Sequence, residues 1–275
     1  MRDATWVDDV AAAPGNSKPD PILVVDGIQR FFGGLRAVDV EHLEVQRNSI
    51  TSLIGPNGAG KTTLFNVLTG FDRPDSGSWH LNGGPLVGLP AYQVARRGMI
   101  RTFQLTRAMP RLTVAENVML AATNNPGESL IRALVGGWSR HERAAAERAE
   151  QLLDRFGILH MRDEYAGTLS GGQRKLLELA RALMVDPELI MLDEPMAGIN
   201  PALSQELLQH IVGLQQDGKS VVFIEHDMDV VQEISDWVVV LAEGKVIAED
   251  RPEGIAGNRE VIDAYLGVHH GEAAS

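Results

Sequence analysis

One short stretch constrains what this chain can fold into more than any other. Residues 55–63 read G-P-N-G-A-G-K-T-T and follow directly on the apolar run 50–54. The stretch matches G-x-x-x-x-G-K-[ST], which binds phosphate when it lies between a strand and a helix, and residues 62–68 have the pattern of that helix. Glycines let backbone N–H groups turn toward phosphates, Lys61 brings a cation to the β and γ oxygens, and Thr62 offers a hydroxyl to Mg²⁺. The stretch therefore predicts a phosphate-binding loop (P-loop) in an α/β fold, and it leaves kinase, GTPase and transport ATPase open.

Other apolar runs alternate with helical patterns along the chain. Short β-rich runs occupy residues 22–25, 189–192, 221–224 and 237–241. Because these strands are apolar throughout, they predict a sheet that is covered on both faces. Helix starts are predicted at Thr113 and Ser170, each followed three residues later by Glu or Gln as in a capping box, and at Asn200, which precedes Pro201. With a charged, alanine-rich helix over residues 140–156, we expect a mainly helical subdomain at about residues 93–170.

Composition excludes several classes of protein. The chain has 275 residues with 25 basic and 37 acidic side chains, a net charge of -12, which argues against nucleic acid as a partner. It has no cysteine, so it has no disulfide framework and no thiolate metal site, and the cytoplasm is the expected compartment. The longest apolar run, residues 237–242, is shorter than the ~18 residues of a membrane span. Residues 1–20 lack the apolar core of a signal peptide and are expected to form a loose tail.

Two carboxylates follow one of the predicted strands. Asp193 and Glu194 come directly after the run 189–192, at the edge where open α/β sheets bind ligands. We expect Asp193 to hold the Mg²⁺ shell and Glu194 to act as the general base on the attacking water. His226 follows the strand expected at 221–225, from which an imidazole reaches a γ-phosphate.

The stretch Leu169-Ser170-Gly171-Gly172-Gln173 has two interpretations. Ser170 and Gln173 cap a helix that runs to Met184. The free N–H groups, the two glycines and the helix dipole also make an anion site suited to a γ-phosphate. A cap alone does not require the two glycines.

Together these residues resemble the ATP-binding subunit of ABC transporters, over residues 22–267. The P-loop, Gln104, the signature 169–173, the Asp193-Glu194 pair, the segment 196–200 and His226 occur in the family's order and spacing. The resemblance implies a P-loop NTPase core, with a RecA-like mixed sheet and an antiparallel β subdomain, and a helical subdomain that carries the signature. It implies one ATP-binding domain over residues 21–267, with flexible tails at 1–20 and 268–275.

In this family two ATPase domains pair head to tail, so each ATP lies between one P-loop and the partner's signature. The resemblance makes Phe32 the residue that stacks on adenine, with Phe31 as the alternative. It makes Gln104 a Mg²⁺ contact that senses the membrane subunit. Asn200 stands where many relatives have Asp, which leaves open whether Asn200 makes the contact that this Asp makes in those relatives.

The implied ATP-binding set is Phe32, Gly55, Pro56, Asn57, Gly58, Ala59, Gly60, Lys61, Thr62, Thr63, Gln104, Ser170, Gly171, Gly172 and Gln173. The implied Mg²⁺ ligands are Thr62, Gln104 and Asp193, and the implied catalytic residues are Glu194, His226 and Lys61.

Within the family, three stretches resemble the ATP-binding subunit of branched-chain amino acid importers. They are residues 32–38, 101–104 and 261–267, the last within a family-specific end at about 250–267. The ATPase of lipopolysaccharide or lipid export is the alternative, although that group has Asp at the position of Asn200 and lacks the Ala-Tyr-Leu-Gly ending. A soluble ABC ATPase or a binding-only regulatory subunit fits less well, because the chain has no second ATPase domain and its catalytic positions are intact.

The expected partners are a second ATPase subunit, identical or different, two membrane permeases and, indirectly, an extracytoplasmic binding protein. The expected location is the cytoplasmic face of the cell membrane, as a peripheral subunit.

Overall fold

The computed structural model describes residues 5–102, 108–122 and 138–272, and the chain divides into two compact units. Unit 1 comprises Met1–Arg101, Glu188–Pro195 and Ile211–Ser275, and unit 2 comprises Thr102–Pro187 and Met196–His210. Unit 1 has both sheets and unit 2 is helical, so the predicted α/β class with a helical subdomain is confirmed. Within the described ranges no helix combines the length and apolar character needed to cross a bilayer.

Unit 1 contains a six-stranded mixed sheet in the order β10-β9-β3-β8-β7-β6. The β10–β9 pair is antiparallel, and the other neighbours are parallel. The strands of this sheet are β3 (Ile50–Ile54), β6 (Met99–Arg101), β7 (Leu189–Asp193), β8 (Ser220–Ile224), β9 (Trp237–Ala242) and β10 (Lys245–Asp250). β3, β7 and β8 are buried at every position, as their continuous apolar pattern predicts.

A second, four-stranded sheet of unit 1 is antiparallel, in the order β2-β1-β4-β5. Its strands are β1 (Pro21–Phe32), β2 (Leu35–Gln46), β4 (Ser76–Leu81) and β5 (Gly84–Pro85). β1 continues well past the expected end at Val25, because it pairs with β2 along almost its whole length. This sheet is the antiparallel β subdomain that the resemblance implied.

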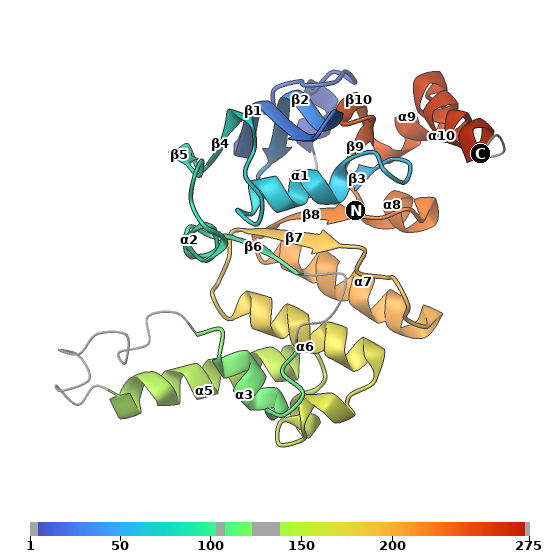
Figure 1. Cartoon of the computed structure of the whole chain (residues 1–275). Coiled ribbons are helices and arrows are strands. Elements are labelled where there is room, and N and C mark those ends of the chain that lie inside the picture. The colour runs from blue at the N-terminus through green and yellow to red at the C-terminus, as the bar shows by residue number, and fades with distance from the viewer. Residues whose placement is uncertain (1–4, 103–107, 123–137, 273–275) are drawn as a thin grey trace. The chain divides into compact units, whose positions relative to one another are not determined.

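Helix α1 (Lys61–Leu68) is the centre of the unit 1 core, and Figure 1 shows it between the strands of the two sheets. Its residues Leu64 and Phe65 belong to one apolar cluster with Trp79 of β4 and Leu53 of β3. The remaining helices of this unit are α2 (Ala91–Arg96), α8 (Met228–Ile234), α9 (Pro252–Ala256) and α10 (Arg259–Glu272). α10 extends into the segment 268–275 that was expected to be a tail.

The N-terminal segment is packed rather than loose. It contains a 3-10 helix η1 (Thr5–Asp9), in which the Trp6 ring lies 5.7 Å from that of Trp237. Further on, Lys18 Nζ lies 2.9 Å from Glu249 Oε2, and both side chains are almost fully buried. The prediction of a loose tail is therefore wrong for residues 5–20. Trp6 packs against Trp237, and Lys18 pairs with the buried carboxylate of Glu249 on β10. A sequence pattern reveals neither contact.

Unit 2 is built from helices α3 (Val114–Met119), α5 (Trp138–Arg155) and α6 (Gly171–Leu183), with short 3-10 turns η3 (Leu159–Met161) and η4 (Ala166–Thr168). Helix α7 (Pro201–Gln216) begins in unit 2 and ends in unit 1. The capping boxes at Thr113 and Ser170 are both present, as predicted. The expected limits of 93–170 are wrong at both ends, because α2 and β6 belong to unit 1 whereas α6 belongs to unit 2.

Candidate nucleotide-binding site

The order of strands brings three predicted site segments to one edge of unit 1. β8 lies between β3 and β7 in parallel register, with Ile224 opposite both Leu53 and Asp193. The P-loop follows β3, Glu225 and His226 follow β8, and Glu194 follows β7. Because carboxyl ends of parallel strands share an edge, segments far apart in the sequence meet there.

The P-loop backbone approaches two other strands so closely that only glycine fits. A Cβ on Gly55 would lie 1.9 Å from the carbonyl oxygen of Leu241, and one on Gly60 would lie 2.2 Å from that of Ala37. Both glycines also have positive φ, which disfavours other residues. On its outer side the loop is held by a hydrogen bond of 2.9 Å from Gly244 N to the Ala59 carbonyl. The P-loop is therefore packed closely against β9 of its own sheet and against β2 of the other sheet.

The ammonium group of Lys61 is bound by backbone carbonyls of the P-loop itself. Its Nζ donates hydrogen bonds to the carbonyls of Gly55 (2.6 Å) and Pro56 (3.0 Å). Burial lowers the pKa of Lys61, and the carboxylates of Glu194 and Asp193 act in the opposite direction. A phosphate in the loop would offer this ammonium group stronger, charge-assisted hydrogen bonds than those two carbonyls.

Behind the loop, α10 contributes a residue that sequence reasoning did not assign to the site. Burial raises the pKa of the Tyr265 hydroxyl, and a hydrogen bond with the backbone of Gly55 opposes that shift. Tyr265 lies in the Ala-Tyr-Leu-Gly ending, which in the sequence indicates the subfamily but not a place in the site.

The two carboxylates after β7 differ in their surroundings. Asp193 is buried, and Arg101 Nη2 donates a hydrogen bond of 2.6 Å to its Oδ2. Glu194 has φ +46°, a left-handed conformation that is uncommon for a non-glycine residue, and its N–H donates to the Ile224 carbonyl at 3.1 Å. Strained backbone of this kind concentrates at functional sites, where the surrounding structure holds it in place.

A cleft of about 810 Å³ is lined by the P-loop, by Glu194 and by residues at the turns that join β1 to β2 and β9 to β10. This volume is within the range of small-molecule sites. Phe32 lines it and Phe31 does not, which favours Phe32 of the two candidates for the base. The lining residues are Phe32, Leu35, Arg36, Ala37, Asn57, Gly58, Ala59, Gly60, Lys61, Thr62, Thr63, Glu194, Glu243 and Lys245.

The oxygen donors at this edge suit Mg²⁺, which binds proteins through one or two carboxylates and completes its shell with substrate phosphates and water. Thr62, the second residue of α1, lines the cleft, and Asp193 is the last residue of β7. No group of three or more His, Cys, Asp or Glu side chains that could hold a metal occurs among the described residues.

Four predicted residues of unit 1 do not line this cleft: Gly55, Pro56, Asp193 and His226. The side chain of His226 is 69% exposed and is absent from the lining, although the residue lies at the correct strand end. Gln104 lies outside the described residues.

The signature lies in unit 2 and has both predicted properties of a helix start. Ser170 Oγ accepts from Gln173 N at 3.3 Å, and the Gln173 side chain accepts from Ser170 N at 2.9 Å. A Cβ on Gly172 would lie 1.5 Å from a methyl carbon of Leu203 on α7, whereas nothing lies within 4 Å of one on Gly171. Packing against α7 thus accounts for Gly172, so of the two glycines Gly171 alone points to an anion site. Nearby, Asn200 caps α7 by accepting from Leu203 N at 2.9 Å, as predicted.

Comparison with known proteins supplies the family. The family model described as ABC transporter matches residues 38–197, more than half of the chain. The chain belongs to the ABC transporter ATP-binding family. A second model, described as branched-chain amino acid ATP-binding cassette transporter, matches residues 245–271 of this ABC ATPase.

Relatives of the ABC ATPase match it over nearly its whole length. It is 42% identical over 250 residues to the high-affinity branched-chain amino acid transport ATP-binding protein LivG of Escherichia coli K12, covering 90% of this chain and 98% of the relative. The corresponding protein BraF of Pseudomonas aeruginosa has the same identity and coverage. A crystal structure of an ATP-binding cassette of an ABC transporter in its ADP conformation superposes with a TM-score of 0.78 at 34% identity, covering 90% of this chain and 99% of that one. The chain is therefore an ATP-hydrolysing subunit with the ABC fold.

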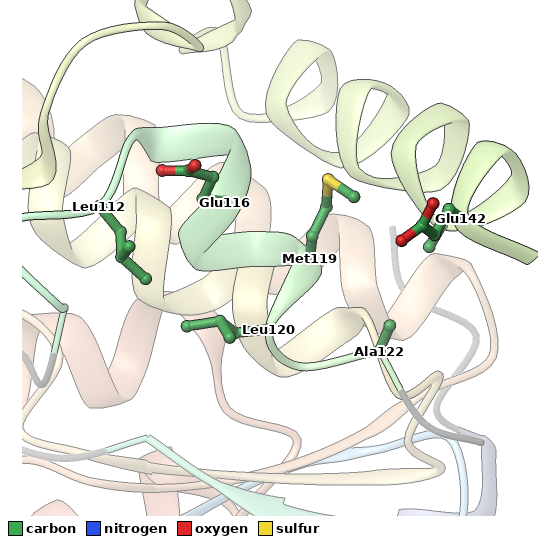
Figure 2. A pocket seen from close by; sticks show the side chains of 7 residues that line it. Leu112, Glu116, Met119, Leu120, Ala122 and Glu142 are labelled. Atoms are coloured by element: carbon green, nitrogen blue, oxygen red, sulfur yellow. The ribbon is translucent and has the colours of Figure 1, made fainter. Parts of the chain in front are cut away.

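Unit 2 of the ABC ATPase also has a groove of about 340 Å³ between the segment around α3 and helix α5. Figure 2 shows Met119 and Glu142 on its two sides, with Leu120 and Leu112 on the α3 side. Leu120 is 55% exposed, although it is a large apolar residue. The groove lies within the segment expected to form the helical subdomain, about residues 93–170.

Proposed function

We propose that this chain binds and hydrolyses ATP to drive the import of branched-chain amino acids or related amides. The observation that carries the proposal is the single cleft that joins the P-loop, Phe32 and Glu194. The cargo is supported by the names of its relatives and by the match of its C-terminal end to the branched-chain amino acid model.

In this proposal ATP enters the cleft with its base on Phe32 and its phosphates in the P-loop. Backbone N–H groups of the loop bind the phosphate oxygens, and Lys61 exchanges its two carbonyl partners for the β and γ oxygens. Thr62 and Asp193, with Gln104, would hold Mg²⁺, which would supply charge neutralisation to the phosphates. Glu194 accepts a proton from the attacking water, and His226 contacts the γ-phosphate.

The second half of the site comes from a partner ATPase, identical or different, in head-to-tail arrangement. Its Ser170, Gly171, Gly172 and Gln173 receive the γ-phosphate across the interface. The open space at Gly171 supports this role, because the N-terminal N–H groups of α6 are approachable there.

We also propose that the groove of Figure 2 receives a short helix from a membrane permease, with Gln104 as the hinge to the core. Apolar Leu120 and Met119 match the apolar face of such a helix, and Glu116 and Glu142 match a basic residue on it. The chain then works as a peripheral subunit at the cytoplasmic face of the membrane, and an extracytoplasmic binding protein delivers the substrate. Crosslinks from the permease to residues 246–251 instead would contradict this orientation.

Replacement of Glu194 tests the proposed chemistry. Glu194→Gln keeps the shape of the side chain and removes the base, so ATP binding should persist while turnover falls by roughly 10²- to 10⁴-fold. The variant should also accumulate as an ATP-bound dimer, visible by size-exclusion chromatography. Turnover close to that of the unchanged protein would remove Glu194 from the mechanism.

A further inference from the structure

Arg30 lies over the aromatic ring that faces the nucleotide cleft. Arg30 and Phe32 are next-but-one neighbours on β1, and the pairing of β1 with β2 shifts register between Arg30 and Phe31. The Cζ atom of Arg30 lies 4.5 Å from the centroid of the Phe32 ring, which is the geometry of a cation–π contact. A guanidinium therefore covers one face of the ring, while Phe32 remains 49% exposed and lines the cleft.

Two carboxylates from the segment between α1 and β4 hold this guanidinium in place. Arg30 Nε donates to Asp72 Oδ2 at 2.8 Å, and Nη1 lies 3.4 Å from Asp75 Oδ2. Asp75 also accepts the N–H of Phe31 at 2.7 Å, and Asp72 N donates to the Asn66 carbonyl of α1 at 3.0 Å. The side chain of Arg30 is only 22% exposed. The segment that orients Arg30 is thus bonded to α1, the helix that follows the P-loop.

We propose that Arg30 is a positioning residue for the base of the nucleotide: it holds Phe32 from behind and leaves the opposite ring face for adenine. The inference rests on the proposed stacking of the base on Phe32. A cation on one face draws the π electrons of the ring toward it, so the other face becomes a better partner for an electron-rich purine. A ring that is already held also loses less rotamer freedom when the base stacks on it.

The test compares a nucleotide with a ligand that has no base. Affinities of ATP, ADP and inorganic tripolyphosphate are measured by calorimetry for the full chain and for Arg30→Met, which keeps an unbranched side chain and removes the cation. We expect the ATP and ADP affinities to fall by roughly 2- to 5-fold, the equivalent of about 0.5 to 1 kcal/mol, and the tripolyphosphate affinity to stay unchanged. Unchanged ATP and ADP affinities, or equal losses for all three ligands, would overturn the proposal.

Two further variants separate this inference from the proposed site itself. Arg47→Met removes another arginine of unit 1 that is paired with an aspartate, Asp20 at 3.0 Å, and it should leave all three affinities unchanged. Phe32→Ala should lower the affinities of ATP and ADP but not that of tripolyphosphate, and adding Arg30→Met to it should cause no further loss, because the two residues act as one unit. If Phe32→Ala leaves the ATP affinity unchanged, the base site itself is wrong. If Arg30→Met lowers the ATP affinity by the same factor in the Phe32→Ala variant as in the unchanged protein, Arg30 acts independently of Phe32 and the inference fails.

Discussion

Arg101 and Asp193 form a buried ion pair in which Nη2 and Oδ2 are 2.6 Å apart and each side chain is 4% exposed. Arg101 ends β6, immediately before the segment that leads to Gln104, and its Nη1 also donates to Asn66 of α1 at 2.5 Å. One guanidinium thus connects the proposed Mg²⁺ ligand with the P-loop helix.

Loss of this cation should leave a buried carboxylate uncompensated. We expect Arg101→Met to lower the free energy of unfolding by about 3 to 5 kcal/mol, measured by urea denaturation. The double variant Arg101→Met, Asp193→Asn should recover part of the loss, because it removes the unpaired charge. Equal stability of the single variant and the unchanged protein would contradict the pairing.

Lys61→Ala should weaken nucleotide binding itself. Lys61 faces the proposed phosphate position, and a hydrogen bond to a charged group contributes about 1.5 to 3 kcal/mol, so ATP affinity should fall by roughly 10- to 150-fold. Titration with a fluorescent ATP analogue measures the change. Lys219→Ala, at the start of β8 and away from the cleft, serves as the matched control, and equal affinities for the two variants would argue against the P-loop assignment.

Ser170 can be tested for its two roles with two substitutions. As a cap, Ser170→Ala should cost about 0.5 to 2 kcal/mol of stability and leave ATPase activity per folded molecule unchanged. As part of an anion site, Ser170→Arg in the Glu194→Gln background should abolish the ATP-dependent dimer while ATP still binds the monomer. We expect the second result, since the space at Gly171 is open. A dimer that forms with and without Ser170→Arg, seen by size-exclusion chromatography, would reduce Ser170 to a cap.

His210 should make unit 2 less stable in mild acid. Burial lowers the pKa of His210, Glu206 opposes the shift, and Arg155 adds to it. The imidazole packs edge-on against Phe156 with centroids 4.8 Å apart. Because the unfolded chain takes up the proton first, stability should be constant above the unfolded pKa of about 6.5 and should fall as the pH drops below it.

Denaturation at several pH values between about 7.5 and 5.5 measures this effect. His210→Gln should flatten the fall, whereas His160→Gln, an exposed histidine of the same unit, should not change it. The same slope for His210→Gln and the unchanged protein would disprove the contribution.

The sequence by itself determined the parts of this protein in which a local pattern is sufficient. The stretch 55–63 predicts a P-loop because its glycines, lysine and threonine have the spacing of a phosphate-binding loop. The strands at Ile50–Ile54 and Leu189–Asp193 are predicted by continuous apolar runs, which are typical of strands buried on both faces. The caps at Thr113, Ser170 and Asn200 were predictable for the same reason, since each bonds to a residue three positions away.

Only the tertiary structure decided which distant residues meet. Lys18 and Glu249, Arg101 and Asp193, and Arg30 and Asp72 are each separated by tens or hundreds of residues, and no periodicity encodes such pairs. Gly172 and Gly171 look equivalent in the sequence, yet Leu203 lies against one and nothing against the other. A local pattern specifies backbone conformation through neighbouring residues, whereas the partner of a buried charge or of a close-packed glycine is set by how strands and helices from different parts of the chain come together.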